Sequence, residues 1–219
     1  MKFHVVTIFP GLLDSYLSDS ILARAITSKK ISVQSYNPRS LSGNKHKKVD
    51  DRPYGGGPGM VMTALPILKT VKKIKATLAR RKSPVRIKTI LFSPGGELFS
   101  NTQARKLQKG YTDIILICGR YEGIDDRVRK ILRATEVSIG DFVLTGGELP
   151  ALVLLDAITR QIPGVLGKFE SLEEERISSH CMYTRPEVLP WDSKNYKVPK
   201  VLMSGDHKKI EKWRESGSC

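Results

Sequence analysis

The sequence has little cysteine, few carboxylates and no long apolar run. Its 219 residues include three cysteines without a C-x-x-C pair, which excludes a disulfide framework and a cysteine zinc site: Cys118, Cys181 and Cys219. Its four histidines show no metal-ligand spacing, so we predict no metal site. No stretch approaches the roughly 18 apolar residues of a membrane span, and the amino terminus lacks the apolar segment of a secretory signal. These absences predict a protein of the reducing cytoplasm.

Two nucleotide-binding motifs are also missing from the sequence. It contains no G-x-x-x-x-G-K-[ST] loop, and no G-x-G-x-x-G follows the first apolar run. A phosphate cradle is therefore poorly supported, and so is a nucleotide-dependent oxidoreductase.

Positive charge is abundant. Lysine and arginine number 37 against 22 aspartates and glutamates, which gives a net charge of +15 and a pI near 9.8. Such a balance favours a polyanionic partner, most simply nucleic acid. The lysine-rich segment 69–82 alternates with apolar residues at helical spacing, and we interpret its charge as the solvated outer face of an amphipathic helix.

Apolar runs typical of strands alternate with helical patterns along most of the chain. We predict strands at 3–9, 31–36, 85–92, 114–118 and 137–139, and helices at 12–26, 65–78, 102–109, 126–133 and 148–160. This alternation predicts an α/β fold with a parallel sheet. Residues 164–190 interrupt the pattern and are interpreted as a linker or mobile loop, and a final helix is predicted at 207–214.

Three glycine-bearing loops follow predicted strands, at 91–96, 118–123 and 139–150. Glycine lets the backbone approach a ligand closely, and ligands of open α/β sheets bind at the carboxyl ends of strands. Glu122 and Asp141 would repel phosphate, but they suit a cationic or hydroxyl-rich ligand such as S-adenosylmethionine. The alternative is that all three loops are ordinary turns.

The sequence of these loops resembles that of a known family. The motifs are VDDRPYGGGPGM at 49–60, CGRYEGID at 118–125, the segment 138–150, IPGVLG at 162–167 and YTRPEV at 183–188. On these motifs the chain is similar to the bacterial tRNA (guanine-N1)-methyltransferases, which belong to the SPOUT superfamily and modify the guanosine 3′ of the anticodon, at position 37. The likeness extends from the first strand to about Trp213.

The resemblance implies a sheet with a deep trefoil knot, S-adenosylmethionine as the methyl donor, and an obligate homodimer whose active sites are shared between subunits. It implies a knotted donor-binding domain at 1–163, a linker at 164–182 and a small helical tRNA-binding domain at 183–219, shortened relative to the family. By motif, the donor-binding residues are Leu91, Ser93, Pro94, Gly95, Gly119, Tyr121, Glu122, Gly123, Ile139, Gly140, Asp141, Phe142, Val143, Leu144, Gly146, Gly147 and Pro150.

The resemblance also assigns the catalytic groups. An arginine at the end of the helix after the knot falls on Arg160, and it would stabilise charge on the guanine oxygen. The family's general base is an aspartate in a Ser-x-x-x-Asp-Ser pattern, and alignment on Ser171 places Glu175 there. Glu173 or Glu174 are alternatives, as are a solvated acidic loop and a helix-capping role for Arg160. Whether Mg²⁺ is required stays open.

Substrate-binding residues are expected at Asp50, Gly55, His46 and Arg185. Asp50 could accept hydrogen bonds from the guanine, or it could form an Asx turn. A base in a single-stranded loop can be extruded into a pocket and recognised by its edge. The basic residues at 208–214 are candidates for gripping the tRNA backbone.

Two rival functions share this fold. One is another SPOUT enzyme that methylates a ribose or a ribosomal RNA base, and the other is an RNA-binding module that keeps the knot without catalysis. Donor binding distinguishes the second from an enzyme, because a pure binder needs no methyl donor.

Overall fold

The computed structural model describes residues 1–166 and 181–216. The chain divides into two compact units, Met1–Val165 and Leu166–Cys219, and each is described by itself. Within the described ranges, no helix is both long and apolar enough to cross a membrane.

A parallel five-stranded sheet forms the centre of the first unit, in the order β2-β1-β6-β5-β7. All five residues of the middle strand β6 are buried, as its unbroken apolar sequence predicts for a strand covered on both faces. The α/β fold with a parallel sheet is thereby confirmed. The strands are β1 (Lys2–Val6), β2 (Ser32–Tyr36), β5 (Ile87–Leu98), β6 (Asp113–Ile117) and β7 (Thr135–Ser138).

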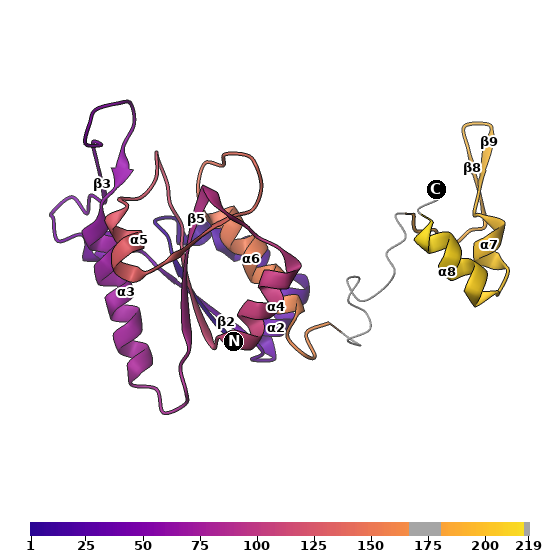
Figure 1. The fold of residues 1–219 in the computed structure, drawn as a ribbon, viewed down its shortest axis with the longest axis horizontal. Helices are drawn as coiled ribbons and strands as arrows, with labels where there is room; N and C mark the ends of the chain where they lie inside the picture. The colour runs from indigo at the N-terminus through magenta and orange to yellow at the C-terminus, as the bar shows by residue number, and fades with distance from the viewer. Residues whose placement is uncertain (167–180, 217–219) are drawn as a thin grey trace. The chain divides into compact units, whose positions relative to one another are not determined.

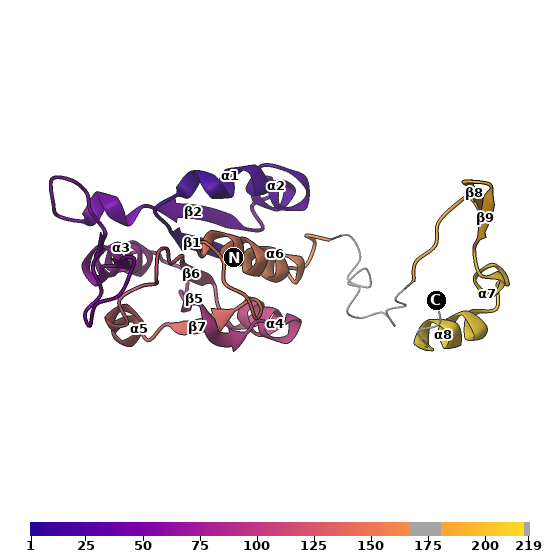
Figure 2. The same ribbon diagram turned by 90° about the horizontal axis from the view of Figure 1, so that it is seen from above.

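Helices cover both faces of this sheet, so the first unit has three layers. Figure 2 shows α3 and α5 on one side of the strands and α2, α4 and α6 on the other. Side chains of β6 alternate between the two apolar cores, with Leu116 facing α6 and Ile117 facing α3. The helices are α2 (Ser20–Thr27), α3 (Ala64–Ala79), α4 (Asn101–Gly110), α5 (Arg127–Leu132) and α6 (Glu148–Arg160).

Several elements differ from the sequence-based expectation. The single helix predicted at 12–26 is wrong, because the chain forms η1 (Pro10–Leu13), α1 (Asp14–Leu17) and α2, with Ser20 at a φ of 57° between them. The short 3₁₀ helix η2 (Pro38–Leu41) and the hairpin of β3 (Asp50–Asp51) and β4 (Val61–Met62) were not predicted. These strands have two residues each, too few for a period-2 pattern to be recognised.

The second unit contains strands as well as helices (Figure 1). The antiparallel hairpin of β8 (Val188–Trp191) and β9 (Lys194–Lys197) corrects the expectation of a purely helical domain. Its two-residue turn has positive φ at Asp192 and Ser193, and it lacks the Asn-Gly or Asp-Gly sequence that marks such turns. The two helices are α7 (Lys200–Met203) and α8 (His207–Glu215), and α8 confirms the helix predicted at 207–214.

The two cysteines that the structure describes differ in oxidation state. Cys118 is a buried free thiol at the end of β6, whereas Cys181 is disulfide-bonded. The sequence predicted no disulfide framework, and a bond at Cys181 alone is not such a framework.

A buried polar network lies where β1 and β6 pair. His4 Nε2 lies 3.2 Å from Oδ1 of the fully buried Asp113, and His4 Nδ1 lies 3.2 Å from the Tyr36 hydroxyl. Arg81 donates two hydrogen bonds to the Asp113 carboxylate, at 2.9 and 2.6 Å, so the buried charge is compensated.

Candidate active site

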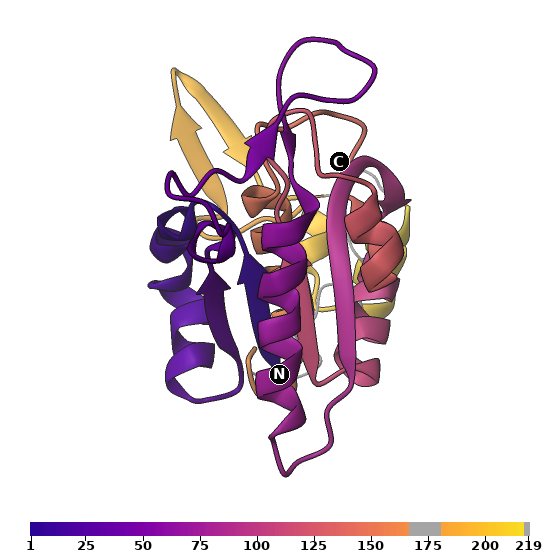
Figure 3. The same ribbon diagram turned by 90° about the vertical axis from the view of Figure 1, so that its left-hand side faces the viewer.

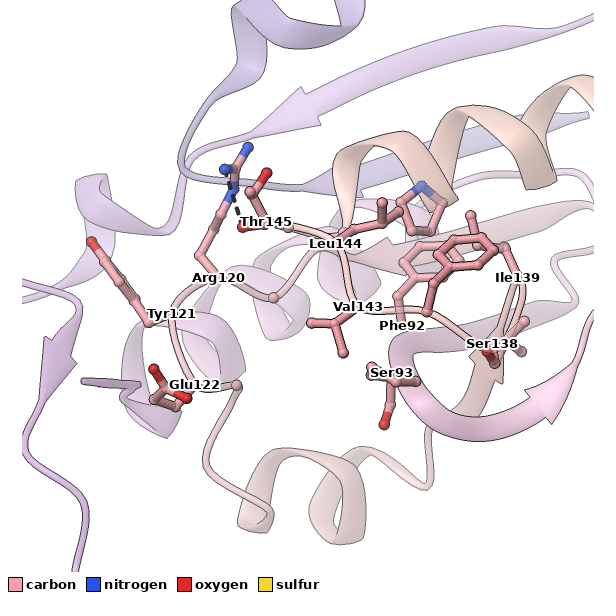
Figure 4. Close-up of a pocket in the computed structure, with 18 residues that line it drawn as sticks. Phe92, Ser93, Arg120, Tyr121, Glu122, Ser138, Ile139, Val143, Leu144 and Thr145 are labelled. Atoms are coloured by element: carbon pink, nitrogen blue, oxygen red, sulfur yellow. Dashed lines mark hydrogen bonds between the residues drawn. The ribbon is translucent and has the colours of Figure 1, made fainter. Parts of the chain in front are cut away.

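One pocket collects an internal segment of β5, the loop at the carboxyl end of β6 and the long loop after β7 (Figure 4). This edge is where ligands of open α/β sheets bind. In the close-up, Tyr121 and Glu122 lie toward one end of the pocket, and Ser138 and Ile139 lie toward the other. The lining residues are Phe92, Ser93, Pro94, Gly119, Arg120, Tyr121, Glu122, Gly123, Val137, Ser138, Ile139, Phe142, Val143, Leu144, Thr145, Gly146, Gly147 and Pro150.

The loop after β6 has an unusual backbone. Tyr121 has a φ of 61°, in the left-handed region that few side chains adopt, and Gly123 has a φ of 130°. Such conformations persist where surrounding contacts impose them. Here the Glu122 amide donates to Met60 O at 3.0 Å, and the Met62 amide donates to Gly123 O at 2.9 Å. The segment before α3 therefore sets the shape of this loop.

The loop after β7 passes very close to the end of β6. The Gly147 amide donates to Gly119 O at 2.9 Å, and a Cβ at Gly147 would lie 2.7 Å from the Cα of Cys118. Backbone atoms cannot move aside as a flexible side chain can, so the contact admits only glycine. Gly147 thus brings the two loops together, and α6 begins at the next residue.

A buried ion pair joins the same loops a second time. Arg120 Nε donates to Glu148 Oε2 at 3.0 Å, and Arg120 Nη2 lies 2.9 Å from the same oxygen. The other carboxylate oxygen accepts from the Thr7 hydroxyl at 2.6 Å, and Glu148 is only 3% exposed. Arg120 also donates to Thr145 O at 3.3 Å, the bond drawn in Figure 4. The Glu148 carboxylate therefore joins three chain segments, which are the start of α6, the loop after β6 and the end of β1.

The chemistry of the pocket lining suits a cationic ligand with an apolar part. Glu122 is the only carboxylate among the lining residues, and the only lysine or arginine there, Arg120, is already paired with Glu148. Apolar side chains of Ile139, Leu144 and Pro150 form much of the wall. Beneath the pocket, burial raises the pKa of the Cys118 thiol well above its ordinary value, so this residue stays protonated and is a poor nucleophile.

Most residues predicted to bind the donor line this pocket, but four do not. Leu91 is buried in the core below it, and Gly95, Gly140 and Asp141 are outside the lining set. Ser93 and its neighbours, predicted as a loop after a strand, instead form an irregularity within β5, where the register with β7 shifts between Phe92 and Glu97. Sequence reasoning missed five lining residues: Phe92, Arg120, Val137, Ser138 and Thr145. All five adjoin predicted residues, so extending each motif by one or two positions would have found them.

The predicted substrate residues are only partly brought together. Asp50 lies on β3 and is half-buried, and the Gly55 loop leads to Met60, which is bonded to Glu122. His46 is exposed in the preceding loop. Arg185 is exposed in the second unit.

Of the two predicted catalytic residues, the structure describes only Arg160, which is not among the residues that line the pocket. Arg160 is the last residue of α6, twelve positions beyond Glu148, which at 1.5 Å per residue is about 18 Å along the helix. Glu175 lies outside the described residues, as do Glu173 and Glu174. Within residues 1–166 and 181–216, no group of three or more His, Cys, Asp or Glu side chains could hold a metal ion.

Comparison with known proteins agrees with this geometry. A family model described as tRNA (Guanine-1)-methyltransferase TrmD matches residues 1–219. A protein of Clostridioides difficile named tRNA (guanine-N(1)-)-methyltransferase is 47% identical, over 100% of this chain and 92% of its own length. Proteins of the same name from Thermomicrobium roseum and Pseudoalteromonas atlantica are 48% and 42% identical, over 98% and 99% of this chain and 77% and 79% of their own lengths. The chain belongs to the tRNA (guanine-1)-methyltransferase family.

Proposed function

We propose that this chain transfers a methyl group from S-adenosylmethionine to N1 of the guanosine at position 37 of tRNA. Methylation of a tRNA guanine at N1 follows from the family and from its curated relatives. The observation that carries the proposal for this structure is the pocket of three converging loops, with one carboxylate and no unpaired cation in its lining.

The residues of the pocket fit the methyl donor. Its sulfonium carries positive charge, which the exposed Glu122 carboxylate favours and which an unpaired arginine would oppose. Backbone amides and carbonyls at Gly119, Gly146 and their neighbours can bind the polar edges of adenine, and Ile139, Leu144 and Pro150 can pack against its faces. When bound, the donor supplies an electrophilic methyl group.

The remaining chemistry concerns one proton and one developing charge. Guanine N1 carries a hydrogen, so N1 can form the new bond to carbon only if that proton leaves. We assign its removal to the carboxylate of Glu175, while the electron pair of the N1–H bond stays on N1. Negative charge spreads to the guanine oxygen, where the Arg160 guanidinium stabilises it.

Two copies of the chain would share each active site. Arg160 lies ten positions beyond the pocket residue Pro150, about 15 Å along α6 at 1.5 Å per residue, so a second copy would bring such an arginine to the pocket. A suitable interface exists on α6 and η1, where Leu12, Leu149 and Val153 are 53%, 60% and 47% exposed. Tyr16, on α1 directly after η1, donates to Asp156 of α6 at 2.5 Å. We assign this face to a homodimer.

The proposal also covers the knot, the role of each domain and the cellular location. The close passage of Gly147 beside Cys118 supports a trefoil knot of the SPOUT kind. We assign residues 1–163 to donor binding, 164–182 to the linker that carries the base, and 183–219 to a small domain that grips tRNA with Arg185 and its basic residues. We assign the protein to the cytoplasm, where tRNA is modified, and Mg²⁺ would act on the RNA or on the bound donor.

The test is methyl transfer from labelled S-adenosylmethionine to two tRNA transcripts that differ only at the residue after the anticodon. We expect label on the transcript with guanosine at this position and none on the transcript with adenosine. Equal labelling of both would assign the reaction to another RNA site. Donor binding without transfer to either transcript would point to a defective base or a different RNA substrate, whereas loss of donor binding would favour an RNA-binding module.

A further inference from the structure

The outer face of α3 carries several cations and no carboxylate. Residues Ile67, Val71, Ile74 and Leu78 face the core, and on the opposite side Lys69, Lys72, Lys73 and Arg80 are all exposed. Residues that are three, four, seven or eleven positions apart lie on the same side of a helix. These four side chains therefore form one stripe, the α3 strip. Figure 3 views the molecule from this side, with α3 in front of the sheet. The sixteen residues of α3 include no aspartate or glutamate.

Some exposed cations elsewhere in the chain have carboxylate partners. On α5, Arg129 and Lys130 bind Asp126 at 2.7 and 2.9 Å, and on α8 Lys209 binds Asp206 at 3.1 Å. Among the residues that the structure describes, no ion pair joins any member of the α3 strip to a carboxylate. Like charges three or four positions apart on a helix repel each other, so the strip destabilises the helix in isolation. A polyanion bound along it would remove that repulsion.

The strip continues into the loop expected to contact the substrate. The 3₁₀ helix η2 packs against α3, and a Cβ at Gly43 would lie 3.6 Å from Lys69 Nζ. The loop that follows carries Lys45, His46 and Lys47, all exposed, and it leads directly into β3 with Asp50. From Lys69 to Arg80 the strip then extends about 16 Å along the helix, at 1.5 Å per residue.

We propose that the α3 strip binds the sugar–phosphate backbone of the tRNA outside the nucleotide that is methylated. The inference rests on the proposed function, which supplies tRNA as the polyanion that would bind the α3 strip. The sequence alone favoured a solvated face, because amphipathic helices normally expose charge. The missing carboxylates and the continuity with the substrate loop change this assignment. Phosphate contacts of this kind position the RNA without reading its sequence.

The experiment compares two triple variants with the same change in net charge. The test variant is Lys69→Gln, Lys72→Gln and Lys73→Gln. The control is Lys30→Gln, Lys106→Gln and Lys109→Gln. It removes three exposed lysines, one shortly after α2 and two on α4, from the opposite side of the sheet. The dissociation constant for unmodified tRNA is measured over a range of KCl concentrations, and thermal unfolding and donor binding confirm that both variants fold.

Each lost phosphate contact lowers the slope of log affinity against log salt by about 0.7 to 0.9. We expect the test variant to lose about two units of slope and about tenfold in affinity at physiological salt, with donor binding unchanged. The control should keep the wild-type slope. Equal effects of both variants would show a long-range effect of net charge, and no effect of the test variant would leave the strip solvated; either result overturns the proposal. Methylation by the unaltered chain tests the proposed function separately.

Discussion

Arg120 and Glu148 form an ion pair that links the loop after β6 to the start of α6 beside the pocket, with Arg120 Nε 3.0 Å from Glu148 Oε2. The pair also reaches β1, because Thr7 donates to the free oxygen of the same carboxylate at 2.6 Å. Arg120 lies over the Phe9 ring as well, with its Cζ 4.7 Å from the ring centroid. Contacts of Arg120 and Glu148 with Thr7 and Phe9, which lie outside the pocket lining, therefore help to set the shape of the pocket.

Removing one partner of this pair should destabilise the protein more than removing both. Arg120→Ala leaves a carboxylate that is 3% exposed without its cation, and breaking buried pairs typically costs about 3 to 5 kcal/mol. The double variant Arg120→Ala with Glu148→Ala should recover part of this loss. Urea unfolding of both single variants and of the double variant measures the coupling. Strictly additive losses would show that the two side chains act independently.

Gly147→Ala should weaken donor binding. Its new methyl group would lie 2.7 Å from the Cα of Cys118 and 3.0 Å from the Gly119 nitrogen, so the two loops must separate. We expect the affinity for S-adenosylmethionine to fall at least tenfold, because a displacement of about 1 Å within a site can cost about 100-fold in rate. Gly110→Ala is the matched control, because nothing lies within 4 Å of its added Cβ. Calorimetric titration of the donor into each variant gives the comparison.

Glu175→Gln should stop methyl transfer and leave donor binding nearly unchanged. The amide keeps the size of the side chain but cannot take the guanine proton, and general bases contribute about 100-fold to 10,000-fold in rate. Glu173→Gln and Glu174→Gln are the controls. Single-turnover methylation measures the chemical step directly, and retained turnover in the first variant with loss in either control would move the base to that residue.

Mixing two inactive variants should restore activity if each site is shared between subunits. Gly147→Ala disables the pocket, and Arg160→Ala removes the distant arginine. In a mixed dimer one site combines an intact pocket with an intact Arg160 from the other chain, so random pairing should recover about a quarter of wild-type activity. Recovery is measured after mixing under conditions that exchange subunits. No recovery, with mixed dimers demonstrated by mass, would place Arg160 in the site of its own chain.

The buried His4 network should make stability fall in mild acid. Burial lowers the pKa of His4 despite its hydrogen bond to Asp113, so below the ordinary value of 6.5 the unfolded chain binds a proton that the folded chain does not. Stability therefore decreases as the pH falls below about 6.5. Burial alone would raise the pKa of Asp113, but hydrogen bonds from Arg81, Thr112 and His4 outweigh it and lower that pKa. This second contribution is lost below about pH 3.8, with the same sign.

Melting temperatures measured on either side of pH 6.5 check this prediction. His4→Gln should flatten the dependence around that pH, whereas His46→Gln, at an exposed position, should leave it unchanged. A wild-type melting temperature that stays constant through pH 6.5 would contradict the assignment of a neutral buried His4.

Elements with a strong apolar pattern could be predicted from the sequence alone. The helix predicted at 148–160 coincides with α6, and the strand predicted at 114–118 lies one residue from β6. Two-residue strands such as β3 and β4 could not be found, because their existence depends on pairing with each other rather than on local pattern. The break at Ser20 was missed for a similar reason, since a left-handed serine leaves no mark on the apolar periodicity.

The sequence by itself determined the alternation of strands and helices, two of the three glycine-bearing loops and the family to which the chain belongs. These depend on local composition and on order along the chain. Only the tertiary structure decided which loop residues line the pocket, that Arg120 pairs with Glu148 and that Arg160 lies far from the pocket of its own chain. Such relations depend on distances between segments distant in sequence, and those distances are set by how the strands pair and how the helices pack.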